Sequence, residues 1–364
     1  MQLSSTLAWL VDAAAETAGA DRLLAELGAH LVADGLPLAG GALTLEVPHP
    51  LIARRTWLWR AESGEVIEAL GFAPGGPVAV LGPSPPDDAG WRWLTGIAAG
   101  LVHEDAIGPS GDGPSLSWIG PRPFTLGETD RLRRAARFTA APLAVLAARA
   151  TLTATLEAYL GRRSAARVLA APLRRDLGET IQAALLFADL RDFTALSESN
   201  PPEVVISALN AWFDRIAGAV HAFGGEVLKF IGDGLLAIFP VGGGAPRGAC
   251  DAALRAVSAA RAGMAHLDQE RRRQGLSPLP FGAALHLGEM LWGNIGAADR
   301  LDFTAIGRAV NLVSRLSGLC RPLGKAVLVS GALAAETEAP VIALGTHVLR
   351  GIASPCAVFA LPEN

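Results

Sequence analysis

Two aspartates stand on short apolar segments of the kind that form β-strands. Asp189 follows the run Ala184–Ala188 in FADLRDFTALS, and Asp233 lies between two glycines in LKFIGDGLLAIF. An unbroken apolar run is typical of a strand covered on both faces, so Asp189 is expected at the end of a buried strand. Paired carboxylates bind hard cations such as Mg²⁺ or Mn²⁺ and leave positions open for phosphate and water. The two segments therefore predict a metal centre for phosphoryl transfer.

The sequence between these aspartates predicts elements that could bring them together. A helix is expected over residues 201–223, with Asn200 as its cap and prolines in its first turn. Glu226–Ile231 and Leu235–Phe239 read as two strands around Gly-Asp-Gly, which is a strong hairpin signal. A strand, a crossover helix and a hairpin can place both carboxylates at one edge. Taken alone, Asp233 could instead be a simple turn former, because Asp-Gly is common in hairpins.

Polar residues suited to phosphate occur in two further places. Phe193 and Thr194 open a turn into a polar, helix-starting stretch, whose free N–H groups would suit a phosphate. In FTAIGRAVNLVSRL, Asn311 and Arg315 stand four apart and share one face of a predicted helix. Such a pair can also be an ordinary solvated stripe, since its apolar neighbours mark the buried side.

Five segments resemble the catalytic domain of the class III nucleotidyl cyclases, the adenylate and guanylate cyclase family, and they occur in the family's order. They are FADLRDFT (187–194), GGEVLKFIGDGLLAIF (224–239), ALHLGEMLWGNIG (284–296), LDFTAIGRAVNLVSRL (301–316) and VLRGIASPCAVFAL (348–361). The resemblance implies a ferredoxin-like α/β (α+β) domain. It also implies conversion of a nucleoside triphosphate to a 3′,5′-cyclic nucleotide and pyrophosphate.

The resemblance assigns a role to each matching residue. Asp189 and Asp233 match the two metal aspartates, which implies two Mg²⁺ or Mn²⁺ ions per active site, one acidifying the ribose 3′-hydroxyl and one holding the triphosphate. Asn311 matches the residue that orients the ribose, and Arg315 matches the one that stabilises charge on the α-phosphoryl oxygens. The expected site also includes Leu190 as a metal residue. Its other expected substrate-binding residues are Phe193, Thr194 and Arg350.

Base choice is assigned to Lys229 and Thr304. The family's adenylate cyclases carry a lysine at the position of Lys229, where it donates to adenine N1, whereas guanylate cyclases tend to carry glutamate. A lysine can only donate, so the resemblance implies ATP as the substrate. Thr304 stands where many adenylate cyclases have aspartate, and its hydroxyl can accept from the adenine amino group, although it could also be an ordinary strand-end threonine. Asp302, two residues earlier, is not the aligned position.

Two matching positions depart from the family's pattern. Asp192 stands where the family often has glycine, and Arg350 stands where a lysine usually contacts the triphosphate, a contact that a guanidinium can make with two hydrogen bonds. Three other features are interpreted as structural. His286 is expected to be packed, Trp292 to be core or a dimer contact, and the arginines 271–273 to end a solvated helix.

In the family, the metal residues and the base-binding and transition-state residues come from opposite subunits. The chain carries a single copy of each motif. The resemblance therefore implies a head-to-tail homodimer with two composite sites. Two alternatives remain open: a cyclase for GTP or a pyrimidine nucleotide, and a catalytically silent cyclase fold that acts as a nucleotide-binding or dimerisation module.

The composition favours a soluble, two-domain protein. The chain has 364 residues, of which 51% are hydrophobic and 18% charged. Its net charge of −4 is not the positive charge expected of a nucleic-acid-binding protein. Its three cysteines form no pair-spaced motif, so neither a disulfide scaffold nor a zinc site is indicated. The best apolar stretch, Phe138–Ala148, is about half the length of a membrane span, and the N-terminus lacks the basic segment of a signal peptide. A cytoplasmic location with no membrane or nucleic-acid partner is expected.

The first 150 residues predict a helix, a set of short strands and a closing helix. Helical sequence runs to about Ala33, and a long amphipathic helix starts near Thr125 or Glu128. The predicted elements between them are strands at Ala42–Val47, Thr56–Arg60, Glu65–Leu70, Pro77–Leu81 and Ser115–Ile119 and a helix at about Trp91–Leu101. This order resembles a GAF-like sensor domain.

The expected organisation is thus a GAF-like sensor over residues 1–150, a helical transducer over 151–180 and the cyclase domain over 181–364. An unidentified small molecule would regulate the enzyme through the sensor. Tryptophans of the first half could line its ligand pocket or form an aromatic core; they are Trp57, Trp59, Trp91, Trp93 and Trp118.

Overall fold

The computed structural model describes residues 4–46, 52–72, 88–108, 113–170, 178–297 and 299–362. It divides the chain into two compact units, Met1–Leu152 and Thr153–Asn364. The expected strand Pro77–Leu81 lies outside the described residues.

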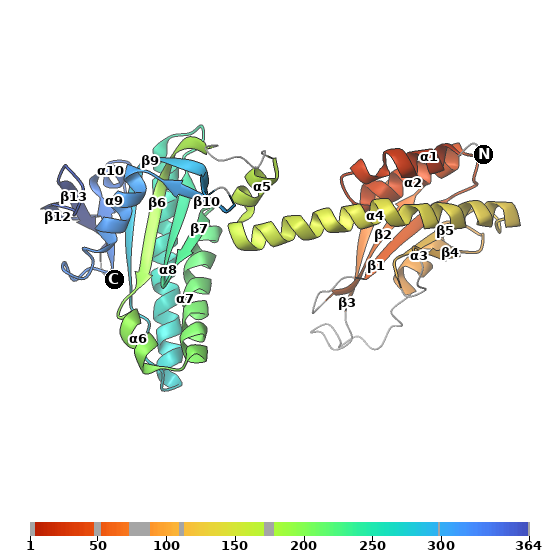
Figure 1. The fold of residues 1–364 in the computed structure, drawn as a ribbon. Coiled ribbons are helices and arrows are strands. Elements are labelled where there is room, and N and C mark those ends of the chain that lie inside the picture. The colour runs from red at the N-terminus through yellow and green to blue at the C-terminus, as the bar shows by residue number, and fades with distance from the viewer. Residues whose placement is uncertain are drawn as a thin grey trace. The chain divides into compact units, whose positions relative to one another are not determined.

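The first unit contains a five-stranded antiparallel sheet with helices on both faces (Figure 1). Its strands, in the order β3-β2-β1-β5-β4, are β1 (Gly40–Glu46), β2 (Ile52–Arg60), β3 (Val66–Phe72), β4 (His103–Ala106) and β5 (Ser115–Ile119). Helices α1 (Ser5–Asp12), α2 (Ala20–Ala33) and α4 (Leu126–Leu160) share a core with one face, and a short 3₁₀ turn, Ala14–Glu16, links the first two. Helix α3 (Asp88–Ile97) packs on the other face.

The tryptophans of the first unit divide between core and surface. Trp57, Trp59 and Trp118 are buried, and the rings of Trp59 and Trp118 meet edge to face at 6.2 Å. Trp91, in contrast, is 44% exposed. The aromatic-core interpretation therefore holds for the sheet tryptophans, whereas Trp91 belongs to the surface.

Helix α4 begins with the predicted capping residues and is longer than its apolar part suggested. The Glu128 N–H donates to Thr125 Oγ1 at 3.3 Å, and the Thr125 N–H donates to the Glu128 carboxylate at 2.7 Å, which is a capping box. The helix has 35 residues and is, by length and composition alone, long and apolar enough to cross a membrane. Of its most apolar 18-residue stretch, 22% is buried inside the structure. The expectation that no stretch reaches this length was therefore wrong. After Gly161, whose φ of +80° ends the helix, the chain continues as α5 (Arg162–Ala170).

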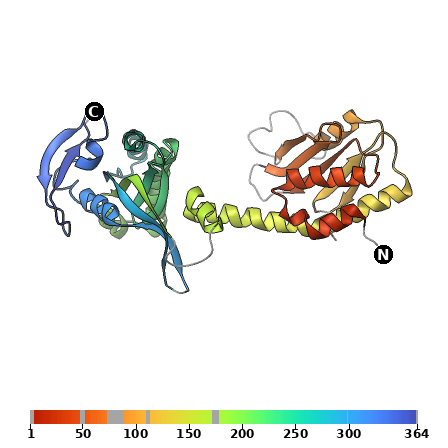
Figure 2. The ribbon, with the colours of Figure 1, turned by 90° about the horizontal axis from the view of Figure 1, so that it is seen from above.

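The second unit is built on an eight-stranded, mostly antiparallel sheet (Figure 1). Its strands are β6 (Gly178–Leu190), β7 (Glu226–Ile231), β8 (Gly234–Pro240), β9 (Phe281–Gly296), β10 (Leu301–Ile306), β11 (Val327–Ser330), β12 (Ile342–His347) and β13 (Cys356–Ala360). Their order is β12-β13-β11-β9-β6-β8-β7, and β10 pairs with β9 alone to form a long hairpin (Figure 2). The β9–β11 pair is parallel.

Helices cover both faces of this sheet, so the apolar run on β6 is buried on both sides. Alternate β6 residues Ala184 and Leu186 share a core with α7 (Pro202–Ala222) and α8 (Pro246–Arg273). Ala183 and Leu185 pack instead with α9 (Arg308–Ser317). The remaining helices are the short α6 (Phe193–Ser199) and α10 (Gly331–Ala334). The expected strand, crossover helix and hairpin are all confirmed.

Two local expectations were wrong, and one was confirmed. Asn200 does not cap α7; its Nδ2 donates to the Leu196 carbonyl at 2.8 Å, at the end of α6. Arg271 is buried rather than solvated, and its Nε donates to the Ser277 carbonyl at 2.7 Å. His286 is packed as expected, with Nδ1 2.8 Å from Ser330 Oγ, and burial lowers its pKa to about 4.

Candidate active site

Asp189 occupies the end of the central strand of the second unit. It lies opposite Gly234 of β8 and Gly282 of β9. A Cβ added to Gly234 would lie 2.9 Å from the Ala188 carbonyl, and one added to Gly282 would collide with the Arg191 guanidinium. Both glycines therefore provide space around the aspartate that a side chain would fill.

The backbone of Asp233 is tied directly to the strand that carries Asp189. Its carbonyl accepts hydrogen bonds from the Leu190 N–H at 3.3 Å and from Trp212 Nε1 at 3.1 Å. Trp212 lies on α7 and is fully buried. The crossover helix thus fixes the hairpin turn against β6, which brings the two predicted metal aspartates together. The Leu190 side chain is buried and carries no donor atom, so Leu190 could serve a metal only through its backbone carbonyl.

The electrostatics of Asp189 fit a bound cation. Burial raises the pKa of its carboxyl, the Arg191 charge lowers it, the neighbouring Asp233 raises it and a hydrogen bond from Ser317 lowers it. Arg191 lies 3.5 Å from Oδ1 without a hydrogen bond, and that oxygen is buried with no hydrogen-bond partner. An unsatisfied buried carboxylate oxygen is costly, and a hard cation would satisfy it.

Further metal ligands would have to come from outside these two side chains. No group of three or more His, Cys, Asp or Glu side chains placed to hold a metal occurs in the described part of the chain. Asp189 and Asp233 with the Leu190 carbonyl would leave positions for phosphate oxygens and water, which is how Mg²⁺ is usually held in phosphoryl-transfer sites. The residues present therefore fit Mg²⁺ or Mn²⁺.

The turn that follows Asp189 forms one wall of a cleft of about 490 Å³. Phe193 and Thr194 line it together with Asp233. Asp192 precedes α6 in the left-handed conformation, with φ 56°, which accounts for a preference for glycine at this point. Arg321 also lines the cleft, 3.5 Å from Asp192. Sequence reasoning missed Arg321, because it lies far along the chain in a loop that carries no motif.

The two predicted base-choice residues lie on strands that approach each other, Lys229 on β7 and Thr304 on β10. A bulge between Val227 and Lys229 shifts the β7 register, and such a shift can re-aim a side chain. The Lys229 ammonium pairs with the Asp302 carboxylate of β10, and Thr304 lies two residues further along that strand. Asp302 does not occupy the family's base-binding position, yet it is the residue that contacts the predicted base-binding lysine.

Asn311 and Arg315 lie on the exposed face of α9, whereas Ala309, Val313 and Leu316 are buried. The helix ends beside Asp189, whose Oδ2 accepts a hydrogen bond from Ser317 Oγ at 3.4 Å. Among the described residues, neither Asn311 nor Arg315 makes a side-chain hydrogen bond or ion pair with either aspartate. Within one chain, the predicted metal residues Asp189 and Asp233 (the metal group) thus share no hydrogen bond or ion pair with Asn311 and Arg315 (the transition-state group).

Arg350 joins neither group. It lies exposed in the turn between β12 and β13, and within the described ranges it forms no ion pair or hydrogen bond with the other predicted residues. Its expected role at the triphosphate stays a prediction.

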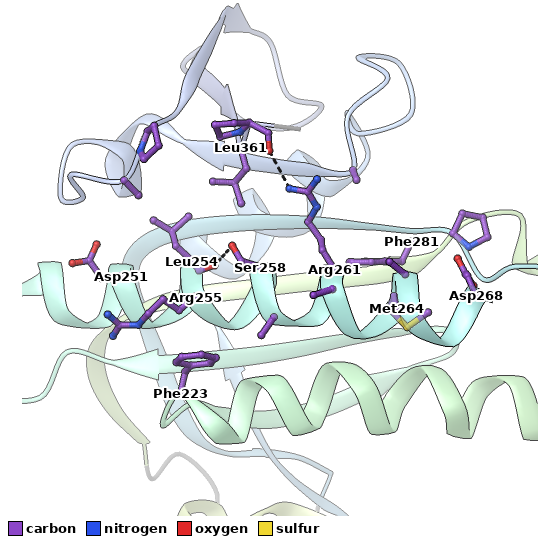
Figure 3. Close-up of a pocket in the computed structure, with 18 of the residues that line it drawn as sticks. Phe223, Asp251, Leu254, Arg255, Ser258, Arg261, Met264, Asp268, Phe281 and Leu361 are labelled. Carbon is purple, nitrogen blue, oxygen red and sulfur yellow. Dashed lines mark hydrogen bonds between the residues drawn. The ribbon is translucent and has the colours of Figure 1, made fainter. Parts of the chain in front are cut away.

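A second groove of the second unit lies away from these residues. It has a volume of about 1130 Å³ and runs along α8 beneath the C-terminal segment (Figure 3). Two of its polar side chains are paired within the chain: Asp268 accepts from the Leu279 N–H, and Arg261 donates to the Pro362 carbonyl. None of the predicted site residues lines it.

Residues 178–335 match the family model of the adenylate and guanylate cyclase catalytic domain. This segment, which is less than half of the chain, is therefore similar to a class III cyclase catalytic domain. The cyclase domain is similar to adenylate cyclase 1 of Rhizobium meliloti, with 33% identity over 153 residues, and to the adenylate cyclase of Anabaena cylindrica, with 30% identity over 165 residues. These matches cover 42% and 44% of this chain but only 23% and 32% of the relatives.

A solved structure supports the fold. A bacterial light-regulated adenylyl cyclase superposes with a TM-score of 0.52 at 22% identity, covering 69% of this chain and 83% of that one. The expected α/β cyclase fold is confirmed for the second unit, and the relatives include adenylate cyclases.

Proposed function

We propose that the chain is an adenylate cyclase that converts ATP to 3′,5′-cyclic AMP and pyrophosphate at the interface of a homodimer. The observation that carries this proposal is the junction of Asp189 and Asp233, with one buried carboxylate oxygen left unsatisfied. Two Mg²⁺ or Mn²⁺ ions held there would acidify the ribose 3′-hydroxyl and neutralise charge on the triphosphate. The 3′-oxygen bonds to the α-phosphorus in line with the departing pyrophosphate.

The remaining residues of the proposed site orient the nucleotide and stabilise charge. Arg315 offers a planar, permanently charged fork to the α-phosphoryl oxygens, and Asn311 orients the ribose. The Phe193–Thr194 turn and Arg350 would hold the triphosphate. The Lys229 ammonium donates to adenine N1, and the Thr304 hydroxyl accepts from the amino group.

A second copy of the chain is the partner that would complete this site. Asn311 and Arg315 face solvent, away from the metal group of their own chain. Nearby strands expose large apolar side chains, with Phe230 51%, Ile231 48% and Ile306 45% exposed. Clustered exposed apolar residues mark association surfaces, which supports a homodimer that pairs the metal group of one chain with Arg315 of the other.

The proposed substrate is tested by incubating the purified chain with each of the four nucleoside triphosphates and Mn²⁺ and identifying cyclic products by mass spectrometry. Cyclic AMP is expected to dominate. Lys229→Glu should lower ATP turnover, because a donor–acceptor match becomes a mismatch that costs about 1–3 kcal/mol. Arg272→Glu, the same charge change at the exposed end of α8, is the control. Comparable use of GTP, CTP or UTP would refute the ATP assignment, and no cyclic product from any nucleotide would favour a silent module.

We further propose that the first unit is a GAF-like sensor that regulates the cyclase through α4 and α5 in response to a small molecule. Its antiparallel sheet with helices on both faces supports this assignment. The start of α5 is fixed to the cyclase domain, where buried Glu226 accepts from the Ser164 N–H at 3.2 Å and from its hydroxyl at 3.3 Å. Arg167 pairs with Glu179 at 2.5 Å and lies 4.6 Å from the Trp292 ring.

A cytoplasmic site of action is part of the same proposal. ATP is found there, and the three cysteines, Cys250, Cys320 and Cys356, are all unpaired, as is usual in a reducing compartment.

Regulation predicts that loosening α5 changes the basal rate. Glu226→Gln in the full chain keeps the shape of the side chain but removes the charge that holds Ser164, a contact worth about 1–3 kcal/mol. A several-fold change in the cyclization rate is expected, whereas Glu203→Gln on the exposed start of α7 should have no effect. Deleting residues 1–152 should also alter the rate. Unchanged rate and dimer affinity after that deletion would reduce the first unit to a passive appendage.

A further inference from the structure

The ammonium of Lys229 is held by a carboxylate that lies outside the family's motif positions. Lys229 Nζ and Asp302 Oδ2 form an ion pair between β7 and β10. The bulge that ends at Lys229 sets the direction of this side chain, and the pairing of Asp302 with Ile295 of β9 sets the place of its partner. Two independent backbone features thus bring the pair together.

Asp302 and Thr304 present their side chains on the same face of β10, because alternate residues of a strand share a face. Thr304 is itself fixed opposite Gly293 of β9. The ammonium therefore lies beside one carboxylate, and the Thr304 hydroxyl is presented on the same strand face as that carboxylate. An ammonium can donate to the edge of a base, and a hydroxyl can accept from it.

Fold stability does not explain this ion pair. The side chains of Lys229 and Asp302 are 34% and 49% exposed, and an ion pair at that exposure contributes little to stability. What the pair does restrict is the lysine itself, whose four-carbon stem otherwise samples many rotamers.

We propose that Asp302 is a positioning residue for base recognition, which holds the Lys229 ammonium so that one of its remaining N–H groups meets the base. This inference rests on the proposed function and names the group that makes its donor effective. An ammonium has three N–H donors, so it can serve Asp302 and the N1 of adenine at once. Thr304 keeps its hydroxyl for the exocyclic amino group. Asp302 acts through Lys229 and does not touch the reacting atoms.

The test is a double-mutant cycle on the full chain with ATP and Mn²⁺. Asp302→Asn keeps the shape and an acceptor oxygen but removes the charge. It should raise the KM for ATP about tenfold with kcat within about twofold, since the charge-assisted contact that holds the ammonium is weakened. Asp302→Glu should keep most of the affinity. Asp299→Asn, an exposed carboxylate on the same hairpin, is the matched control and should leave KM unchanged.

The cycle separates positioning from an independent contact. Lys229→Met should weaken ATP binding, and adding Asp302→Asn to it should cause no further rise in KM. The proposal would be overturned if the rise in KM of the double variant equalled the product of the rises in the single variants. An unchanged KM in Asp302→Asn would also overturn it. The ratio of kcat/KM for ATP over GTP should fall with Asp302→Asn, because a mobile ammonium no longer selects one edge of the base.

A binding measurement keeps this inference distinct from the proposed activity. Calorimetric titration with 3′-deoxy-ATP, which lacks the attacking hydroxyl, should show the same roughly tenfold loss in Asp302→Asn and the same absence of a further loss in the double variant. Wild-type protein that makes no cyclic product but shows this binding pattern would refute the adenylate cyclase assignment and support the role of Asp302. Wild-type protein that makes cyclic AMP but does not show this binding pattern would support the adenylate cyclase assignment and refute the role of Asp302.

Discussion

Asp189→Asn and Asp233→Asn are each expected to lower kcat by on the order of 10²-fold or more, because each removes a charged ligand from the metal group. Thermal stability should move differently. Burial raises the pKa of Asp189, so its charge is unfavourable in the folded, metal-free chain. The neutral asparagine should therefore keep or raise the Tm at neutral pH while the activity collapses.

The measurement is the rate of cyclic AMP formation as a function of Mn²⁺, paired with thermal unfolding with and without the ion. Wild-type protein should gain Tm on adding Mn²⁺, and both variants should lose most of that gain. Asp214→Asn on the exposed face of α7 provides the control. A variant that keeps both its rate and its Mn²⁺-dependent Tm would exclude that aspartate from the metal centre.

Mixing Asp189→Ala with Arg315→Ala is expected to restore about a quarter of wild-type activity, although each variant alone is nearly inactive. Each variant alone forms homodimers with two damaged sites. In a mixed dimer, one site carries both lesions and the other carries none. Random exchange makes about half of the dimers mixed, and each of these has one intact site out of two.

The matched control mixes variants from the same group. Asp189→Ala with Asp233→Ala should restore nothing, because every site then lacks one metal aspartate. Asn311→Ala with Arg315→Ala should fail for the equivalent reason on the other group. Absence of recovery in the Asp189 and Arg315 mixture, despite subunit exchange measured by mass spectrometry, would place the whole site within one chain.

The elements that carry the two proposed metal aspartates could be predicted from the sequence because their signals are local. The apolar run before Asp189 and the Gly-Asp-Gly hairpin each specify an element, and both elements occur where expected. The same kind of local reasoning predicted the wrong cap for α7. Pro201 and Pro202 have no N–H, so fewer donors at that end need a side-chain acceptor, and Asn200 serves the preceding helix instead.

Contacts between distant segments could not be read from spacing. The hydrogen bond from Trp212 to the Asp233 carbonyl depends on how α7 lies on the sheet. The pairing of Lys229 with Asp302 depends on a bulge in β7. Strand β4 was missed because His103–Ala106 is mostly polar and too short for an alternating pattern.

The central position of β6 has a consequence for how the chain is made. Strand β6 is bonded on one side to β8, which is synthesised soon after it, and on the other to β9, which follows only after the long helix α8. A nascent chain that has not yet reached Phe281 therefore leaves one whole edge of β6 unpaired. Loop closure over that distance is slow, and unpaired edges invite aggregation. The rate of translation through α8, and chaperone binding during that interval, should thus govern how much folded protein a cell obtains.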